Sequence, residues 1–132
     1  MRRLDQSTFV FVRQFTVADV DEAAAQGVRL IVNNRPDGEE PDQPASAEIE
    51  AAARAAGLDY RHIPIAHGFP PDRIEAMARA LDEGPVLAFC RSGTRSTFLW
   101  ALARASRRAP ADDSLAAAAA AGYDLGPIRG LL

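Results

Sequence analysis

The chain has 132 residues, of which 48% are hydrophobic and 25% are charged, and its formal net charge is −3. These values are those of one ordinary globular domain, and the weak acidity and scattered arginines give no reason to expect a nucleic acid or an acidic membrane surface as partner. The single cysteine excludes an internal disulfide. The start at residues 1–3 is basic, but residues 5–8 are polar where a signal peptide would be apolar, so we expect a cytoplasmic domain.

The first part of the chain alternates between strand-like and helix-like segments. A short β-rich run at residues 9–12 precedes a helix at residues 16–26, where Thr16 and Asp19 are spaced as in a capping box and Gly27 is a stop signal. Residues 28–32 are a second apolar run and predict a buried strand. The polar segment 33–40 that follows is about as long as functional loops tend to be.

The alternation continues toward the C-terminus. The pattern predicts a helix at residues 46–56 opened by Ser46, a strand at 60–65, a loop at 66–70, a helix from 71–72 to the residue before Gly84, and an alanine-rich helix at 115–121 capped by Asp113 and Ser114. Residues 122–132 carry no signal that assigns them to an element.

The strongest chemical signal surrounds the only cysteine. Five apolar positions, 86–90, predict a buried strand that ends at Cys90, and the spacing of apolar residues at 98–103 predicts a helix shortly after it. The loop between them consists of Arg91, Ser92, Gly93, Thr94, Arg95 and Ser96. A loop that closes onto a helix N-terminus points several N–H groups at one place, where a thiolate is stabilised. A buried structural cysteine beside surface arginines is the simpler alternative, but the conjunction of these residues favours a reactive thiolate.

Strands that alternate with helices predict an α/β fold, namely one domain over residues 1–132 with a mainly parallel sheet and helices on both faces. Residues 109–132 would form a C-terminal helix and tail. Ligands of such sheets bind beyond the carboxyl ends of the strands. Three polar loops follow strands, at residues 33–40, 66–70 and 90–95, and we expect them to meet at one edge of the sheet.

Two of these loops resemble a known family. They read Asn33-Asn34-Arg35-Pro36-Asp37-Gly38-Glu39-Glu40 and Cys90-Arg91-Ser92-Gly93-Thr94-Arg95-Ser96, with Trp100 downstream. Together with the strand at 60–64, they resemble the beta-lactamase hydrolase-like family over about residues 4–108. The resemblance implies a fold similar to that of dual-specificity protein tyrosine phosphatases, in small bacterial proteins described both as phosphatase-like and as sulfur transferases. Some relatives carry a fused metallo-hydrolase domain that acts as a persulfide dioxygenase, and we expect no such domain here.

The Cys90 loop is also similar to that of rhodaneses, which carry a Cys-Arg-Ser-Gly-x-Arg sequence. The phosphatase signature has five residues between Cys and Arg, whereas four separate Cys90 from Arg95 in this chain. Phosphatases of this fold also have an aspartic acid just after the strand equivalent to 60–65, where this chain has His67 between Ala66 and Gly68. A shorter loop leaves less room for a phosphoryl group, and sulfur transfer needs no acid, because sulfite or a thiolate leaves as an anion.

These departures favour a rhodanese-type sulfurtransferase, in which Cys90 takes sulfane sulfur as a persulfide and passes it to an acceptor thiol or cyanide. Arg91 and Arg95 would bind a small anionic donor such as thiosulfate or a persulfide, and the N–H groups of residues 92–96 would hold the persulfide. The alternative is a cysteine phosphatase that forms a phosphocysteine from a phosphate ester, with Arg95 on the phosphate and His67 or Asp72 as the acid. A third hypothesis is a non-catalytic sensor that binds an anion or records oxidation at Cys90.

The other titratable residues have simpler explanations. His62 lies in a predicted strand, where we expect it to be hydrogen-bonded within the sheet. Arg35 would line the pocket rim with Asp37 and Glu39, or the three would form an ion-pair cluster that stabilises their loop. Two histidines and one cysteine do not make a convincing metal site, so no metal or other cofactor is expected.

Overall fold

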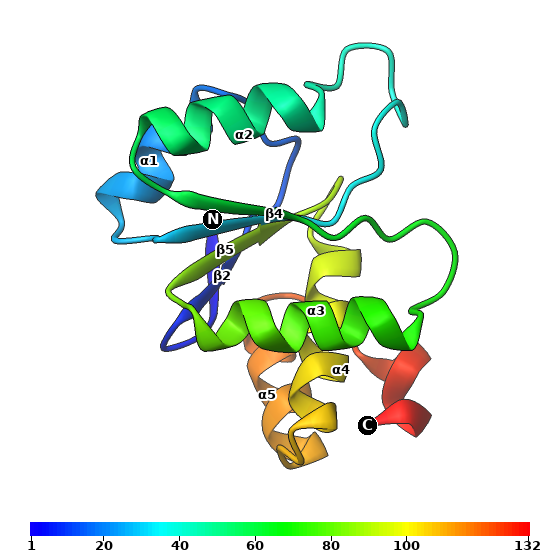
Figure 1. The fold of residues 1–132 in the computed structure, drawn as a ribbon. Coiled ribbons are helices and arrows are strands. Elements are labelled where there is room, and N and C mark those ends of the chain that lie inside the picture. Colours follow the sequence, from blue (N-terminus) through cyan, green and yellow to red (C-terminus); the bar gives the residue numbers. More distant parts are fainter.

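The computed structural model describes residues 1–132 and contains a five-stranded sheet with the order β1-β2-β5-β3-β4 (Figure 1). β1 (Arg2–Asp5) is antiparallel to β2 (Thr8–Val10), while β2, β5 (Val86–Phe89), β3 (Leu30–Asn33) and β4 (Asp59–His62) are parallel. α1 (Asp19–Ala25) and α2 (Ser46–Ala55) cover one face, and α3 (Pro71–Asp82), α4 (Thr94–Ser106) and α5 (Ala111–Ala120) cover the other. The expected α/β fold with a mainly parallel sheet between helices is confirmed.

Each face of the sheet has its own apolar core. One core joins residues such as Phe11, Phe15 and Ile49 from the side of α1 and α2, and the other contains Trp100 and Met77 from the side of α3 and α4. The alternate residues of β5 belong to different cores, because successive side chains of a strand point to opposite faces. Burial on both faces accounts for the continuous apolar run that ends at Cys90. Because β5 is buried on both faces, the start of the loop that follows it is anchored in the core.

Several element boundaries differ from the sequence-based expectation. β1 was not predicted, because its two arginines are exposed and give no apolar signal. α1 begins at Asp19, whose carboxylate accepts hydrogen bonds from the N–H and hydroxyl of Thr16 at 2.8 and 2.9 Å. The Thr16 side chain therefore donates to Asp19 and does not cap the helix. α5 begins at Ala111 rather than after Ser114, whose buried hydroxyl accepts a hydrogen bond from Arg104 instead of capping a helix.

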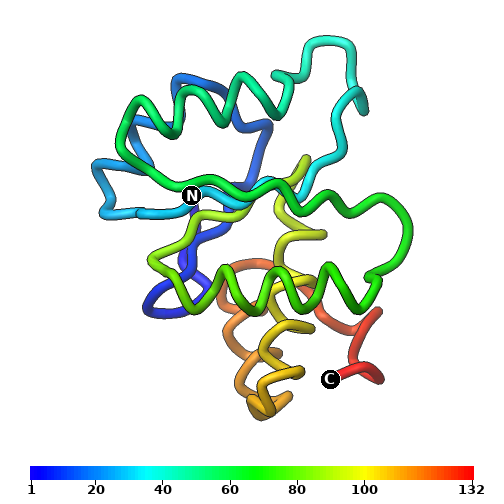
Figure 2. Tube along the Cα trace, viewed as in Figure 1, coloured from blue at the N-terminus to red at the C-terminus, as the bar shows by residue number.

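The three polar loops lie on one side of the sheet, on the right in Figures 1 and 2. β4 is shorter than expected, but the chain beyond it stays hydrogen-bonded to the end of β3, since the N–H groups of Ile63 and Ile65 donate to Asn33 and Asn34. The last residues form a short 3-10 helix, η1 (Gly126–Leu131), beside α4. None of the helices is both long and apolar enough to cross a membrane.

Candidate active site

Cys90 lies at the carboxyl end of β5 and is only 1% exposed. Gly93, the residue before α4, has a φ of +96° and turns the chain so that its N–H donates to Cys90 Sγ at 3.2 Å. The N–H groups at the start of α4 have no carbonyl one turn earlier within the helix, and the positive end of the helix dipole lies there. A negative charge at the sulfur, or on a ligand just beyond it, is therefore stabilised at this position.

Position 93 accepts no side chain, for two reasons. Its left-handed backbone conformation is favourable only for glycine. A Cβ there would also lie 2.8 Å from the carbonyl oxygen of Phe11 and would collide with the hydroxyl of Tyr123. The close approach of Phe11, the residue after β2, and of Tyr123 thus restricts the shape of the Cys90 loop.

Arg95 uses one edge of its guanidinium for structure and leaves another free. Nη1 donates to Glu39 Oε2 at 2.7 Å and to the carbonyl oxygen of Ile65 at 2.9 Å, while Nη2 donates to Glu39 Oε1 at 2.9 Å. A guanidinium has five N–H donors, so the Nε–H and one Nη2–H remain. These two N–H groups form one edge, which matches two oxygens of an anion. The pKa of Arg95 is raised, chiefly by the hydrogen bond to Glu39 and further by the negative charge of a Cys90 thiolate nearby.

Glu39 lies between two arginines. Besides Arg95, it accepts a hydrogen bond from Nε of Arg35 at 3.0 Å. The hydrogen bond from Arg95 is the main cause that lowers the pKa of Glu39, and the bond from Arg35 adds to it. Arg35 is 2% exposed and also donates to the side chain of Gln14, so it lies behind Glu39 rather than on the pocket rim. The expected ion-pair cluster of this loop thus contains Arg35 and Glu39 and adds Arg95, whereas Asp37 accepts the N–H of Ser46 instead.

The other loop residues have distinct surroundings. Arg91 is exposed and pairs with Glu40 at 3.0 Å, outside the loop. The side chains of Ser92 and Thr94 are exposed, with their hydroxyl oxygens 3.3 Å apart. Ser96 is buried, and its hydroxyl donates to Asn34 Oδ1 at 2.8 Å, which ties the start of α4 to the end of β3. The Ser96 hydroxyl is therefore not available to an anion, and only its backbone N–H stays a predicted donor.

Both residues expected as acid candidates are exposed. His67 belongs to the β4–α3 loop, two residues after Ile65, whose carbonyl oxygen accepts a hydrogen bond from Arg95. Asp72 lies in the first turn of α3, with its side chain 73% exposed. His62, in contrast, lies at the end of β4 with Nε2 2.9 Å from the carbonyl oxygen of Arg35, as expected of a residue bonded within the sheet.

Sequence reasoning did not assign two contributors to this site. Tyr123 follows α5, and its hydroxyl donates to the carbonyl oxygen of Ser92 at 2.7 Å. Its segment had no assigned structure, so no local pattern could have placed the ring against the loop. The tie between Glu39 and Arg95 also depends on the fold, although the sequence did mark Glu39 as part of a charged loop.

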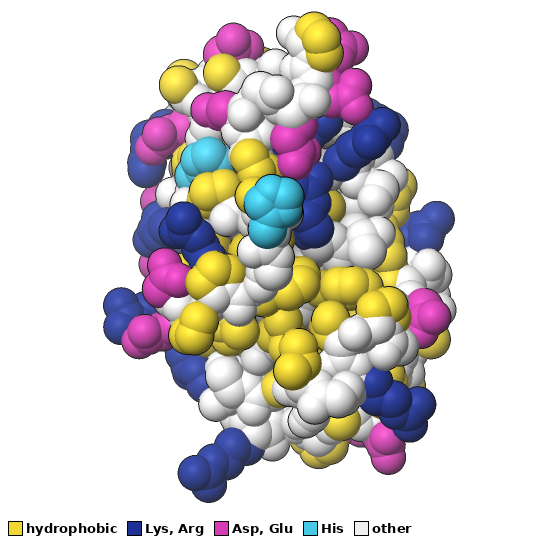
Figure 3. Space-filling model, turned by 90° about the vertical axis from the view of Figure 1, so that its right-hand side faces the viewer, with side chains coloured by type: hydrophobic (Ala, Val, Ile, Leu, Met, Phe, Trp, Pro, Cys, Tyr) yellow, Lys and Arg dark blue, Asp and Glu magenta, His cyan; other side chains and the backbone are white.

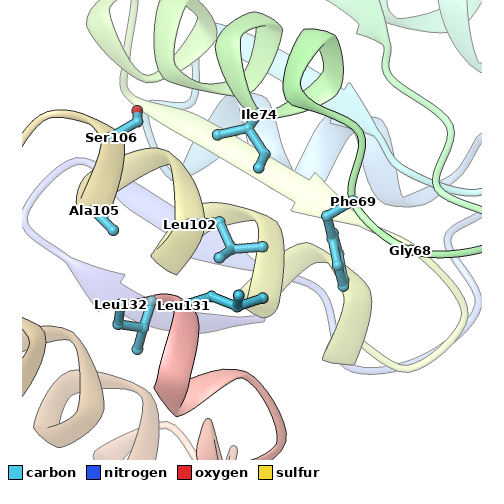
Figure 4. A pocket seen from close by; sticks show the side chains of 8 residues that line it. All are labelled: Gly68, Phe69, Ile74, Leu102, Ala105, Ser106, Leu131 and Leu132. Carbon is cyan, nitrogen blue, oxygen red and sulfur yellow. The ribbon is translucent and has the colours of Figure 1, made fainter.

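A separate apolar groove of about 540 Å³ lies between α3, α4 and η1 on the same face of the molecule (Figures 3 and 4). Phe69, Ile74, Leu102 and Leu131 are among its lining residues, and no member of the Cys90 loop belongs to it. Figure 3 shows an apolar area on this face, with charged and histidine side chains above it. No three His, Cys, Asp or Glu side chains lie together in a way that could hold a metal ion.

Residues 1–107 match the model of the family described as beta-lactamase hydrolase-like protein, phosphatase-like domain. The beta-lactamase hydrolase-like protein of Agrobacterium fabrum is 44% identical over 95 residues, which are 67% of this chain and 21% of that protein. The chain therefore spans about a fifth of the length of that relative.

Two solved structures place the fold among phosphatases. A protein of Neisseria meningitidis described as a candidate phosphatase shares 34% identity at a TM-score of 0.83, over 98% of this chain and 93% of that one. TpbA of Pseudomonas aeruginosa, solved in complex with pTyr, shares 17% identity at a TM-score of 0.56, over 83% of this chain and 66% of that one, and at this identity only the fold is comparable. The phosphatase-like fold implied by the resemblance is confirmed.

Proposed function

This chain belongs to the family of phosphatase-like domains of beta-lactamase hydrolase-like proteins, and from this membership and the geometry around Cys90 we propose that it is a cysteine-dependent phosphatase. The observation that carries the proposal is the Nε–Nη2 edge of Arg95, which Glu39 leaves open near the buried Cys90 at the N-terminus of α4. The sulfurtransferase that the sequence favoured has no support from the comparisons, whereas its phosphatase alternative has.

The proposed substrate is a phosphate monoester, a small anion with three oxygens around phosphorus. Two of these oxygens would bind the free edge of Arg95, and the N–H groups of residues 94–96 would hold the remaining charge. The Cys90 thiolate would attack phosphorus on the side opposite the ester oxygen, so that an S–P bond forms while the P–O bond breaks. The electron pair of that bond leaves with the alcohol oxygen, which needs a proton.

We assign the supply of this proton to His67. The β4–α3 loop already contacts the site through the bond between Ile65 and Arg95, and His67 follows two residues later. Asp72 is the second candidate, but it belongs to the first turn of α3 and is less free to approach. Water would then attack phosphorus, the S–P bond would break with its electrons returning to Cys90 as thiolate, and inorganic phosphate would leave.

Sulfur transfer is kept as a second candidate because of one observation, the four-residue spacing between Cys90 and Arg95. Both reactions need the same thiolate, so the loss of activity in a Cys90→Ser variant does not distinguish them. The two reactions differ in the group that Cys90 passes on and in its acceptor: water accepts the phosphoryl group, whereas cyanide or a thiol accepts the sulfur.

Two parallel assays test the proposal. One measures phosphate released from p-nitrophenyl phosphate, and the other measures thiocyanate formed from thiosulfate and cyanide, each with the wild-type protein and Cys90→Ser. The proposal expects phosphate release that requires Cys90, and thiocyanate formation no faster than in Cys90→Ser. Thiocyanate formation that requires Cys90, without phosphate release, would reverse the assignment.

A further inference from the structure

The peptide unit between Ser92 and Gly93 is hydrogen-bonded at both of its polar ends. Its N–H donates to Cys90 Sγ at 3.2 Å, and its carbonyl oxygen accepts the hydroxyl of Tyr123 at 2.7 Å. We propose that Tyr123 is a positioning residue for the nucleophile: it holds this peptide with the N–H toward the sulfur, so that the thiolate is stabilised and ready to react. This inference rests on the proposed function for its catalytic consequence, but not for its effect on the thiol.

Within the loop, this peptide is held only by the hydrogen bond from the Gly93 N–H to Cys90 Sγ. Turning the peptide over changes ψ of Ser92 and φ of Gly93, and glycine populates positive and negative φ about equally well. In the turned form, the carbonyl oxygen would face the sulfur, and its partial negative charge would repel a thiolate. A donor on the carbonyl side therefore selects between two otherwise accessible forms, and the Tyr123 hydroxyl is such a donor.

Tyr123 is held firmly enough for this role. Its N–H donates to the carbonyl oxygen of Ala118 at 2.8 Å at the end of α5, and Leu125, two residues later, is buried in the core beside α4. Burial raises the pKa of Tyr123, and the charge of Cys90 raises it further, so the hydroxyl keeps its proton and remains a donor at neutral pH. Tyr123 lies beyond residues 1–107, and the family model therefore carries no information on it.

The test compares two conservative variants. Tyr123→Phe removes only the hydroxyl that holds the peptide. The chain's other tyrosine provides the control, because the hydroxyl of Tyr60 is likewise hydrogen-bonded, to Ser46 and Asn33, but on the opposite face of the sheet. Thermal unfolding of both variants establishes that they are folded.

Two readouts separate positioning from a general structural role. The first is the rate at which iodoacetamide alkylates Cys90 at a pH below the midpoint of the wild-type pH–rate profile, where the rate follows the fraction of thiolate, together with the ultraviolet absorbance of the thiolate. The second is kcat and KM for p-nitrophenyl phosphate. For Tyr123→Phe we expect both the alkylation rate and kcat to fall about 3- to 10-fold, the size of one hydrogen bond, with KM almost unchanged. Tyr60→Phe should leave all three close to wild type.

An alkylation rate and kcat in Tyr123→Phe equal to those of the wild type would overturn the proposal. Equal losses in Tyr60→Phe would overturn it as well, because the effect would then be general. The alkylation rate does not depend on the reaction that the protein catalyses. If neither the wild-type protein nor the two variants hydrolyse the phosphate ester, the proposed function fails. A slower alkylation confined to Tyr123→Phe would still support the role of Tyr123 in that case.

Discussion

Glu39 accepts two hydrogen bonds from Arg95, at 2.7 and 2.9 Å, although the two residues are 56 positions apart in the chain. This pair joins the loop after β3 to the start of α4, and a further bond from Arg35 holds Glu39 from behind. Because Glu39 takes the Nη1–Nη2 edge of Arg95, it does not occupy the edge that an anion would use. The carboxylate therefore orients the arginine without competing for it.

Replacing Glu39 tests this orientation. In Glu39→Gln one of the two accepting oxygens becomes an NH₂ group and the charge is lost, so Arg95 is held less well. We expect kcat/KM for p-nitrophenyl phosphate to fall about tenfold, mainly through a higher KM. Glu40→Gln is the matched control, since Glu40 pairs with the exposed Arg91, and it should remain within about twofold of wild type. Tighter substrate binding in Glu39→Gln would mean that Glu39 competes with the anion.

The same pair predicts a pH dependence of stability. The folded-state pKa of Glu39 lies below its ordinary value of 4.5, chiefly because of Arg95. A carboxyl group of this kind contributes its full stabilisation above its unfolded-state pKa and loses it as the pH falls through the lowered folded-state value. At neutral pH, Glu39→Gln should lower the free energy of unfolding in urea by about 1 kcal/mol. The difference from wild type should shrink as the pH falls through the carboxyl range, and a constant difference would show that charge is not the cause.

The two loop arginines should differ sharply. Arg95→Lys replaces a planar fork by a point charge that cannot bond Glu39 and an anion with two separate edges, and we expect a loss in kcat/KM of about 100-fold or more. Arg91 is 70% exposed and pairs outside the loop, so Arg91→Lys should change kcat/KM by less than about threefold. Steady-state kinetics of both variants checks this, and similar small effects would show that neither arginine contacts the substrate.

Gly93 should be irreplaceable for reasons beyond its φ angle. An alanine with positive φ costs about 1–2 kcal/mol from the backbone alone. Gly57→Ala measures that cost by itself, because Gly57 has a φ of +81° and nothing lies within 4 Å of an added Cβ. Gly93→Ala also meets the carbonyl oxygen of Phe11, so we expect a larger loss in the free energy of unfolding and no measurable activity. Equal losses in the two variants would show that the loop can shift to accept a Cβ.

The assignment of His67 depends on the leaving group. An alkyl phosphate needs a proton on its departing oxygen, so His67→Ala should slow its hydrolysis by about 100-fold or more. The activated p-nitrophenyl ester needs little such help and should show only a small loss. Asp72→Asn is the comparison variant and should affect neither substrate. The opposite pattern, with the large loss in Asp72→Asn, would transfer the role of acid to Asp72.

The sequence was most informative where the site is local. The strand, cysteine, loop and helix N-terminus follow one another within residues 86–96, and the three loops were placed at one edge by the rule for parallel strands. The same rule placed Arg35 near Cys90. It did not predict that Arg35 is buried behind Glu39, because a charged residue in a polar loop is normally exposed.

Contacts between distant segments could not be predicted in this way. Tyr123 reaches Ser92 only because α5 and the residues after it pack against α4, and that packing leaves no periodic signal in residues 122–132. The spacing of Cys90 and Arg95 favoured sulfur transfer, whereas the comparisons support the phosphatase alternative better. The spacing measures the length of the loop, whereas the width of the anion site also depends on how Glu39 holds the arginine.

The central claim is that Cys90 carries the transferred group as a phosphoryl. Intact-mass spectrometry of protein quenched in acid after brief mixing with p-nitrophenyl phosphate, and separately after mixing with thiosulfate, tests it directly. We predict one added phosphoryl group, located at Cys90 and absent from Cys90→Ser, and no stable addition from thiosulfate. A single added sulfur at Cys90 that dithiothreitol removes, without any phosphoryl adduct, would contradict the claim.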